Sequence, residues 1–448
     1  MPSKSPEADY PIVNDLSDAP NWLILAAIFA GLGAMCWITF SREVFAPILE
    51  LAVGDRWAIL LQRPSVLWAA MGTLLLVVRT GLWIGYRPSA SATPSEAPTM
   101  TVVIPAYNEG AMVQKSIESV VRAEYPQGSL EVFVVDDGSV DDTWRHIQWA
   151  AARHPGLVTP LRLPKNMGKR HALAEGIRRA TGEVIVTIDS DSEIEPRALL
   201  ALAGPFRDRR IGAVAGKVTV LNREEGIIPR MLAVRFVFAF DLLRAAQSTY
   251  RTVFCCPGAL SAYRTAAVRP VLERWLNETF LGSSCTFGED RAMTNLLLAA
   301  GYDTVYQRTA VVKTIVPTTY RKLCKMYIRW DRSYVREEIR YARIVWRRPP
   351  RAFLLSLFET VINNVRYPVS YASLGLLVLL VLAHPLVLVR VLFVIGLFAS
   401  FNMLYYLRSE RSPDFLYGVL YAYFAFFGLF WIFPYALVTV RARSWLTR

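Results

Sequence analysis

The sequence has few cysteines, and they are not arranged to cross-link a fold or hold a metal. The five cysteines in 448 residues include no CxxC pair. Their spacing excludes a disulfide framework and a cysteine-based zinc site. The first twenty residues are polar and carry four acidic groups, so they do not resemble a secretory signal. We therefore expect reduced thiols that face the cytoplasm.

The chain also lacks the polar balance of an ordinary soluble protein. Hydrophobic residues make up 53% of it, only 19% are charged, and the net charge is +13. A basic chain can meet nucleic acid, anionic lipid or phosphorylated small molecules. No nucleic-acid recognition motif is present, so we expect the lipid bilayer, and no nucleic acid, among the partners.

Long apolar runs lie at both ends of the chain. Asn21–Phe40 and Val66–Tyr86 are each long enough to cross the hydrocarbon core, and Arg79 lies near one end of the second run, where it can snorkel. We expect a cytoplasmic tail at 1–20 and two transmembrane helices in 21–86. Three further apolar segments make 351–448 a C-terminal transmembrane region: Phe353–Ala383, His384–Tyr406 and Phe415–Val440.

The C-terminal segments leave the number of crossings open. A basic tail favours a cytoplasmic C-terminus, which needs an even number of crossings, yet three segments are present. One segment is therefore expected to be interfacial or broken, for example near Pro434. We expect a multi-pass protein of the plasma membrane whose central domain lies in the cytoplasm.

The central part of the chain alternates between strands and helices. A Pro/Ser/Ala-rich linker at 87–99 precedes it, and the alternation runs from 100 to 316. The expected strands are TVVIPAY, EVFVVDDGS, LVTPLRLP and EVIVTIDSDS, and the expected helices are Gly110–Arg122, Asp141–Arg153 and Lys169–Ala180. This order predicts an α/β domain with a mainly parallel sheet.

Pairs of carboxylates follow two of the expected strands. Asp136 and Asp137 form either an Asx-type turn or a contact to the base or ribose of a nucleotide. Asp189 and Asp191, about fifty residues further on, can share one hard cation with a diphosphate. Either pair alone is weak evidence, but both at strand ends of one domain favour a nucleotide site.

Two helix starts carry further charged groups. In PKNMGKRHAL a glycine precedes Lys169, which suits either a solvated basic turn or a phosphate site. In FGEDRAMTN, Glu289, Asp290 and Arg291 open a helix. The acids are either capping residues or include a general base that takes a proton from a hydroxyl.

The segment 317–350 has helical periodicity and many basic residues. It predicts an amphipathic helix on the cytoplasmic membrane surface. Trp330 is then either an interfacial anchor or part of a site, and the charged residues from Asp331 to Arg340 are expected to form the wet face of this helix.

Together, the motifs DDGS, DSD, GED and RW, with apolar segments on both sides, resemble the processive family 2 glycosyltransferases, which include cellulose, chitin and hyaluronan synthases. The stretches NMGKRHAL, NETFLGSSCTFGEDRAMTN, GYDTVYQRTA and RWDRSYVREE are most similar to hyaluronan synthases. The resemblance runs from about Val102 to Trp346. It implies a GT-A type glycosyltransferase domain embedded between transmembrane helices, with amphipathic interface helices.

The resemblance also implies roles for single residues. Asp136 and Asp137 would hold the uridine of a UDP-sugar, and Lys169 would lie near the nucleotide. Asp189 and Asp191 would bind Mg²⁺ or Mn²⁺, with Asp191 as the more direct ligand. Asp290 would be the catalytic base with Glu289 beside it, Arg329 would contact the diphosphate, and Trp330 would stack on the acceptor sugar; Gly258 and Arg291 complete the expected substrate contacts.

The implied reaction transfers sugars from UDP-N-acetylglucosamine and, for hyaluronan, UDP-glucuronate, to a growing β-linked polysaccharide that crosses the bilayer. Two departures weaken the similarity to hyaluronan synthases: Met326 replaces the Gln of QxxRW, and Pro257 replaces a Ser. GED in place of GDD favours the alternative, a chitin or poly-N-acetylglucosamine synthase. A non-enzymatic alternative is an inactive transporter or nucleotide sensor, against which the complete set of carboxylates argues.

Overall fold

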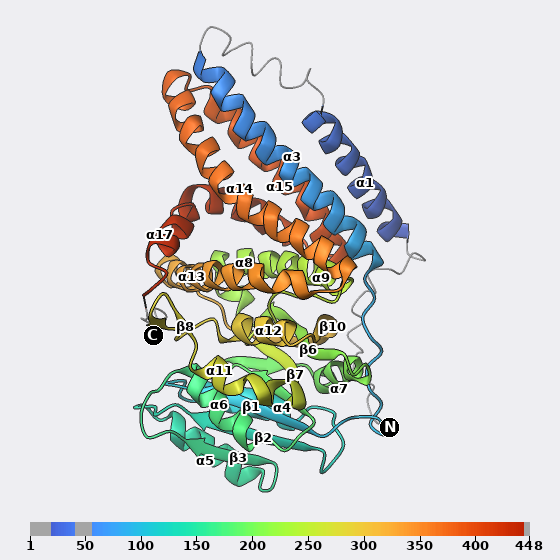
Figure 1. Ribbon diagram of the computed structural model, residues 1–448, viewed down its shortest axis with the longest axis vertical. Helices are drawn as coiled ribbons and strands as arrows, with labels where there is room; N and C mark the ends of the chain where they lie inside the picture. The colour runs from blue at the N-terminus through green and yellow to red at the C-terminus, as the bar shows by residue number, and fades with distance from the viewer. Residues whose placement is uncertain (1–18, 41–55, 443–448) are drawn as a thin grey trace. The chain divides into compact units, whose positions relative to one another are not determined.

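The computed structural model describes residues 19–40 and 56–442 (Figure 1). The expected tail at 1–20 lies outside the described residues, apart from its last two. The contacts divide the chain into two units. The first comprises Met1–Arg87 and Ile362–Tyr423, and the second, larger unit comprises Pro88–Val361 and Phe424–Arg448. Each unit is described by itself.

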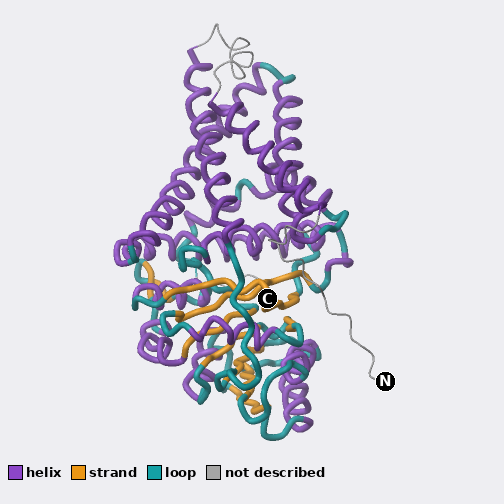
Figure 2. The backbone as a smooth tube through the Cα atoms, turned by 90° about the vertical axis from the view of Figure 1, so that its right-hand side faces the viewer, coloured by secondary structure: helices purple, strands orange, loops and turns teal. Residues whose placement is uncertain are grey.

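The first unit consists of helices that run side by side (Figure 2). They are α1 (Ala19–Phe40), α3 (Arg56–Gly85), most of α14 (Pro350–Ala383), α15 (Val387–Glu410) and most of α16 (Phe415–Phe424). In the described part of the chain, three helices are apolar and long enough to cross a membrane: Leu67–Gly85, Pro350–Ala383 and Val387–Glu410. The expected first span contains a shorter apolar helix, Asn21–Trp37.

Polar side chains inside this unit have partners on neighbouring helices. The hydroxyls of Thr80 and Tyr405 lie 2.7 Å apart, which joins α3 to α15. Arg79 donates to Asn363 Oδ1 at 3.3 Å, which joins α3 to α14. A Cβ on Gly31 would overlap the ring of Phe401, so glycine allows α1 to pack closely on α15.

The last apolar segment is broken, as expected. The helices Phe415–Leu429 and Ile432–Val438 meet at 45°. Pro434, in α17 (Ile432–Val438), has no N–H to offer the carbonyl four residues earlier, at the break. The pair counts either as one bent span or as a re-entrant turn.

The second unit is built on an eight-stranded sheet in the order β3-β2-β1-β4-β7-β6-β10-β5. The strands are β1 (Met100–Ala106), β2 (Leu130–Asp136), β3 (Val158–Arg162), β4 (Val184–Ile188), β5 (Ser192–Ile194), β6 (Ile211–Val220), β7 (Leu260–Arg264) and β10 (Asp303–Thr314). Four pairings are parallel. The antiparallel pairings are those of β5 with β10 and of β7 with β4 and β6. The predicted mainly parallel α/β domain is therefore confirmed.

The strand order reverses at β1. The chain first adds β2 and β3 on one side of β1 and then returns to place β4 on the other. Ligands of open α/β sheets bind at such a switch point, outside the carboxyl ends of the strands. Both carboxylate pairs, at the ends of β2 and β4, lie at this edge.

Helices cover the sheet, and the first three of them lie where the sequence predicts helices. They are α4 (Met112–Val121), α5 (Thr143–Arg153) and α6 (Lys169–Arg179), followed by the short α7 (Ala198–Ala203), α10 (Thr265–Val268) and α11 (Leu272–Leu276). The hairpin of β8 (Thr279–Phe280) and β9 (Ser283–Ser284) leads to α12 (Glu289–Ala299). Gly176 lies so close to Val103 that a Cβ would come within 2.5 Å of it, which seats α6 on β1.

Two longer helical segments complete the unit. One is continuous and consists of α8 (Ile227–Val237), a π-helical stretch (Phe238–Arg244) and α9 (Ala245–Ser248). The other is α13 (Tyr320–Ile344), which packs on α17. Its first residue, Tyr320, donates to the carbonyl of Gly428, just before α17, at 2.6 Å. Arg332 of α13 donates to Thr439 Oγ1 at 2.9 Å.

The expectation of a wet face from Asp331 to Arg340 is wrong. Four charged side chains in this stretch are buried: Arg332, Arg336, Glu337 and Glu338. They can be buried because other charges and backbone groups of the same unit pair with them. This part of α13 is a packed helix with a charged interior face.

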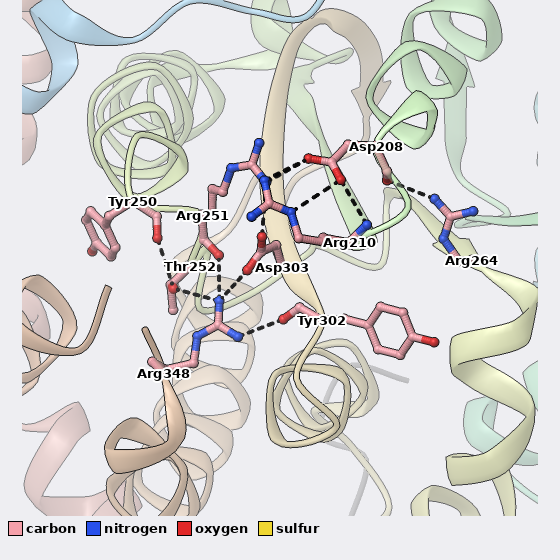
Figure 3. Close-up of polar contacts among 9 residues, drawn as sticks. All are labelled: Asp208, Arg210, Tyr250, Arg251, Thr252, Arg264, Tyr302, Asp303 and Arg348. Atoms are coloured by element: carbon pink, nitrogen blue, oxygen red, sulfur yellow. Dashed lines mark hydrogen bonds and ion pairs between the residues drawn. The ribbon is translucent and has the colours of Figure 1, made fainter. Parts of the chain in front are cut away.

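The residues after α13 are anchored by a network of arginines and carboxylates (Figure 3). Arg348 donates to Asp303 Oδ1 at 2.8 Å and to the carbonyls of Tyr302 and Arg251. Arg251 in turn pairs with both Asp208 and Asp303. The network fixes the start of α14 to the beginning of β10.

Candidate active site

The first aspartate of DDGS is wholly buried at the end of β2. Asp136 Oδ1 accepts a hydrogen bond from the Ser139 backbone N–H at 3.0 Å, and Oδ2 lies 3.0 Å from Arg162 Nε at the end of β3. These contacts are those of a turn with an ion pair. The expected uridine contact of Asp136 stays a prediction.

Asp137 holds the loop that precedes Lys169. Its two carboxylate oxygens accept the backbone N–H groups of Met167 and Gly168, each at 2.8 Å. Burial raises the pKa of Asp137, although these hydrogen bonds oppose the rise. Gly138 has a φ of 69° and lies so close to Lys165 and Asn166 that a Cβ would meet their backbone. The DDGS turn and the basic loop are therefore folded onto one another.

Lys169 is the first residue of α6 and bridges two acidic motifs. Its ammonium nitrogen lies 2.5 Å from Asp189 Oδ1 and 2.9 Å from Glu289 Oε1. Burial would lower the pKa of Lys169, but the two carboxylates outweigh it and raise the pKa. The same pairing holds the pKa of Glu289 below its usual range against the opposing effect of burial. Lys169 is therefore a fixed positive charge.

The second aspartate of DSD lies between β4 and β5. Asp191 Oδ1 accepts from the hydroxyls of Ser192 and Thr314, both at 3.3 Å. Asp189 already carries a cation, the Lys169 ammonium, on one oxygen. Two carboxylates with hard oxygen donors fit Mg²⁺ or Mn²⁺ if a diphosphate and water supply the other ligands. The described residues alone form no cluster of three or more His, Cys, Asp or Glu side chains for a metal.

Asp290 lies beside this cluster, at the N-terminus of α12. Its Oδ1 accepts the Arg291 N–H at 2.7 Å, and its Oδ2 accepts the Gly258 N–H at 3.3 Å. The thiol of Cys255 is 3.6 Å from the same Oδ2. Burial, followed by the charge of Glu289, raises the pKa of Asp290. A carboxylate with raised proton affinity is suited to act as a general base.

A small, mostly apolar cavity lies behind the two acids. Its lining includes Leu173, Ile177, Trp275 and Met293, together with Glu289 and Asp290. Apolar walls deprive a carboxylate of solvating water and so favour its neutral form. Apolar side chains on this side of Asp290 are consistent in sign with the raised pKa of its carboxyl.

Gly258 allows the loop before β7 to approach the cluster. A Cβ at this position would lie 2.9 Å from Lys169 Nζ, 3.5 Å from Asp189 Oδ1 and 3.6 Å from Glu289 Oε1. Only a residue without a side chain leaves this space open. Gly258 therefore lies against this cluster, and its expected substrate contact stays a prediction.

The RW motif lies on the same side of the sheet. Burial lowers the pKa of Arg329, and the carboxylates of Glu289, Asp189, Asp290 and Asp191 oppose this through their charges. Trp330 is 42% exposed and packs on Tyr327 and Phe236, with ring centroids 5.5 and 6.4 Å away. The structure thus brings the guanidinium of Arg329 within electrostatic reach of these four carboxylates, and the next residue, Trp330, keeps part of its ring exposed.

Apart from Asp191 and Trp330, the expected residues fall into two groups. Lys169, Asp189, Gly258, Glu289 and Asp290 surround one point, and Arg329 acts on that point electrostatically. Asp136, Asp137 and Arg291 instead hold neighbouring segments in place.

Sequence reasoning missed the thiol of Cys255 at the base, and it missed the two contacts that α13 makes with the GED loop through Ser333 and Arg336. A signal for these two was present, because positions 329, 333 and 336 share one helix face.

The site combines a carboxylate of raised pKa, a fixed cation between two acids, and a partly exposed tryptophan. Such a site can deprotonate a hydroxyl while positive charge stabilises an anionic leaving group. On a mostly parallel sheet with the site at its switch point, this defines a GT-A type glycosyltransferase.

Comparison with known proteins supports this class. The profile described as Glycosyl transferase family 2 matches residues 101–272. A hyaluronan synthase of Streptococcus pyogenes is 33% identical over 383 residues, which cover 83% of this chain and 88% of the relative. An N-acetylglucosaminyltransferase of Rhizobium meliloti is 30% identical over 403 residues, covering 87% of this chain and 92% of the relative.

Among solved structures, a mannosyltransferase of Pyrobaculum calidifontis in complex with GDP-Man and Mn²⁺ has a TM-score of 0.61 at 21% identity. The match covers 80% of this chain and 97% of that one, and it confirms the GT-A fold.

The chain belongs to glycosyltransferase family 2, among its processive membrane-bound members. The expected enzyme class, a UDP-sugar-dependent glycosyltransferase, is thereby confirmed.

Proposed function

We propose that the protein is a hyaluronan synthase, which joins N-acetylglucosamine and glucuronate from their UDP-sugars into a β-linked polymer and passes it across the bilayer. The observation that carries the proposal is the placement of Asp290, a partly buried carboxylate with a raised pKa, beside the Lys169 bridge and within the electrostatic reach of Arg329. The similarity to the Streptococcus pyogenes hyaluronan synthase over most of both chains supports the choice of polymer.

In the proposed reaction, the acceptor sugar stacks on Trp330, and one of its hydroxyl groups attacks the anomeric carbon of the donor sugar. Asp290 takes the hydroxyl proton as the new C–O bond forms, and the old bond to the diphosphate breaks with its electron pair leaving on UDP. One displacement inverts the anomeric centre, so an α-linked donor gives a β-linked product. Lys169 and Arg329 stabilise the developing charge on the diphosphate.

Asp189 and Asp191 are the residues that would hold a divalent cation, Mg²⁺ or Mn²⁺. Such a cation supplies further positive charge to the diphosphate when bound. Asp136 and Asp137, at the neighbouring strand end, are proposed to shape the uridine pocket through the turn and loop that they hold. Arg291 is proposed to act beside the base.

A second candidate is a synthase of a β-linked N-acetylglucosamine polymer. Two observations favour it: the similarity to the Rhizobium meliloti N-acetylglucosaminyltransferase, and Glu289 in place of the aspartate of GDD. Membranes containing the protein, given each radiolabelled UDP-sugar alone and both together, distinguish the two. Hyaluronan synthesis requires both donors, whereas polymer formed from UDP-N-acetylglucosamine alone would favour the second candidate and contradict the first.

The second unit, which carries the candidate active site and is called the catalytic unit below, is proposed to face the cytoplasm, where UDP-sugars are made. The protein is proposed to be a multi-pass protein of the plasma membrane. The apolar helices and their basic flanks support this orientation. Sealed inside-out vesicles should polymerise added UDP-sugars, and right-side-out vesicles should not. The reverse result would contradict the orientation without affecting the chemistry.

A further inference from the structure

One motif has no part in the proposed reaction. SYVREE, residues 333–338 of α13, follows Trp330 within two turns of helix, and most of its charged side chains are buried. A buried charge is costly unless it is paired and hydrogen-bonded. The partners of these side chains therefore show what the motif holds.

Its first contact is with the backbone just before the base. Gly288 has a φ of 74°, and a Cβ there would overlap the Ser333 hydroxyl and lie 2.9 Å from Arg336 Nη2. Arg336 donates to the carbonyl of Phe287 at 2.5 Å, and its guanidinium lies 5.2 Å from the centre of the Phe287 ring. Helix α13 is thus in direct contact with the GED loop.

Its second contact is with the residue just after the base. Glu338 Oε1 accepts from Arg291 Nη1 at 2.9 Å, and both side chains are largely buried. The Arg291 guanidinium also lies 4.9 Å from the ring centre of Tyr334. Since the Arg291 N–H donates to Asp290 Oδ1, this ion pair fixes the residue that orients the base.

A third contact joins α13 to α12 at Asn295, one helical turn after Arg291. Asn295 donates to the carbonyl and to Oε2 of Glu337, at 3.0 and 3.1 Å. Glu337 Oε1 is shared by Arg336 at 3.1 Å and Arg340 at 2.5 Å. The whole N-terminal half of α12, with Asp290 in its first turn, is therefore attached to α13.

We propose that Ser333, Arg336 and Glu338 are positioning residues for the glycosyl transfer. They fix the loop that carries the base to the helix that carries the acceptor platform, Trp330. The inference rests on the proposed function, because it takes Asp290 as the base and Trp330 as the acceptor contact. One rigid helix then sets where the acceptor hydroxyl meets Asp290, and a misplacement of about 1 Å there costs on the order of a hundredfold in rate.

The test compares Glu338→Gln with Glu273→Gln in the full-length enzyme. Glu273 makes a similar ion pair, 2.8 Å from Arg178, but its side chain is 67% exposed, so it controls for the loss of a charge. Glu338→Gln should lower kcat roughly 10- to 100-fold and leave the KM for UDP-N-acetylglucosamine and the Kd of UDP within about twofold. Glu273→Gln should change none of these.

A second comparison covers the case in which Glu338→Gln does not fold. Ser333→Val intrudes on the loop at Gly288 and should lower kcat at unchanged KM, whereas Ser333→Ala removes only the hydroxyl group and should lower kcat less. The double variant Glu338→Gln/Arg291→Gln should have the same kcat as Arg291→Gln alone, because each of the two changes removes the same ion pair.

A purely structural role predicts a different pattern. If Glu338→Gln or Ser333→Val lowers Tm while kcat matches that of its control, the inference is overturned. The same holds if KM for the donor rises in proportion to the loss of kcat. Failure of the wild-type enzyme to turn over any UDP-sugar would instead contradict the proposed function and is distinguishable from either result.

Discussion

The ammonium nitrogen of Lys169 lies 2.5 Å from Oδ1 of Asp189 and 2.9 Å from Oε1 of Glu289. Three sequence motifs that are far apart in the chain, NMGK, DSD and GED, meet at this one nitrogen. Because both carboxylates are largely buried, the cation both neutralises them and presents positive charge at the switch point of the sheet. The expected phosphate-binding role of Lys169 accounts for only half of this arrangement.

Replacement of Lys169 by Met should weaken both folding and donor binding. It leaves the buried carboxylate of Glu289 and the half-buried carboxylate of Asp189 without their shared cation, and loss of one partner of a buried charge pair costs up to about 3–5 kcal/mol. We expect a lower Tm and a UDP Kd raised roughly tenfold or more. Thermal unfolding and calorimetric titration with UDP measure the two effects.

Lys169→Arg is the matched variant, because it keeps the charge and should retain much of the stability. A Lys169→Met protein with the Tm and UDP affinity of the wild type would contradict the role given to the bridge.

Gly258→Ala should disturb the same bridge from the opposite side. The added methyl group would lie 2.9 Å from Lys169 Nζ, and insertion of a methyl group into a packed site costs about 1–3 kcal/mol. Donor turnover is therefore expected to fall about 10- to 100-fold.

The control for this change is Gly85→Ala, where a Cβ meets nothing within 4 Å. Radiolabel incorporation into polymer measures both variants. Equal activity of the two would show that Lys169 does not need the space at Gly258.

Asp331→Asn should stabilise the enzyme at alkaline pH. Burial raises the pKa of Asp331 to about 7, so the folded state binds its proton more tightly than the unfolded state does. The stabilising effect of that proton is full below the ordinary pKa and is lost as the pH rises toward 7. Asparagine does not ionise, so the Tm difference between variant and wild type should be a few degrees larger at about pH 8 than at about pH 5.

Tryptophan fluorescence of the solubilised enzyme follows this unfolding. The same Tm difference at both pH values for Asp331→Asn would contradict the assignment.

Local patterns predict the first half of the catalytic unit well. The β-branched runs at β1, β2 and β4 and the helices α4, α5 and α6 all occur where the periodicity places them. Their pairing follows from the rules for α/β sheets, which also bring Asp136 and Asp189 to one edge. No comparable signal predicts that β5 pairs antiparallel with β10, or that β7 pairs antiparallel with β4 and β6. These pairings depend on contacts between strands that are distant in the sequence.

The exposure of α13 was predicted wrongly for a physical reason. A run such as RSYVREE has the composition of a solvated helix, and only partners distant in sequence reverse that reading. Those partners are the Phe287 carbonyl, Arg291 and Asn295, some forty to fifty residues away. The buried position of Met326, where the resemblance to QxxRW leads us to expect Gln, likewise has no explanation in the sequence alone.

The measurement that tests the central claim most directly is the activity of Asp290→Asn. Asparagine is nearly isosteric with aspartate but cannot take the acceptor proton. Sugar transfer should therefore fall about 10²- to 10⁴-fold while the UDP Kd stays within about threefold of the wild type. Polymer synthesis at the wild-type rate by Asp290→Asn would contradict the assignment of Asp290 as the base, and with it the proposed mechanism.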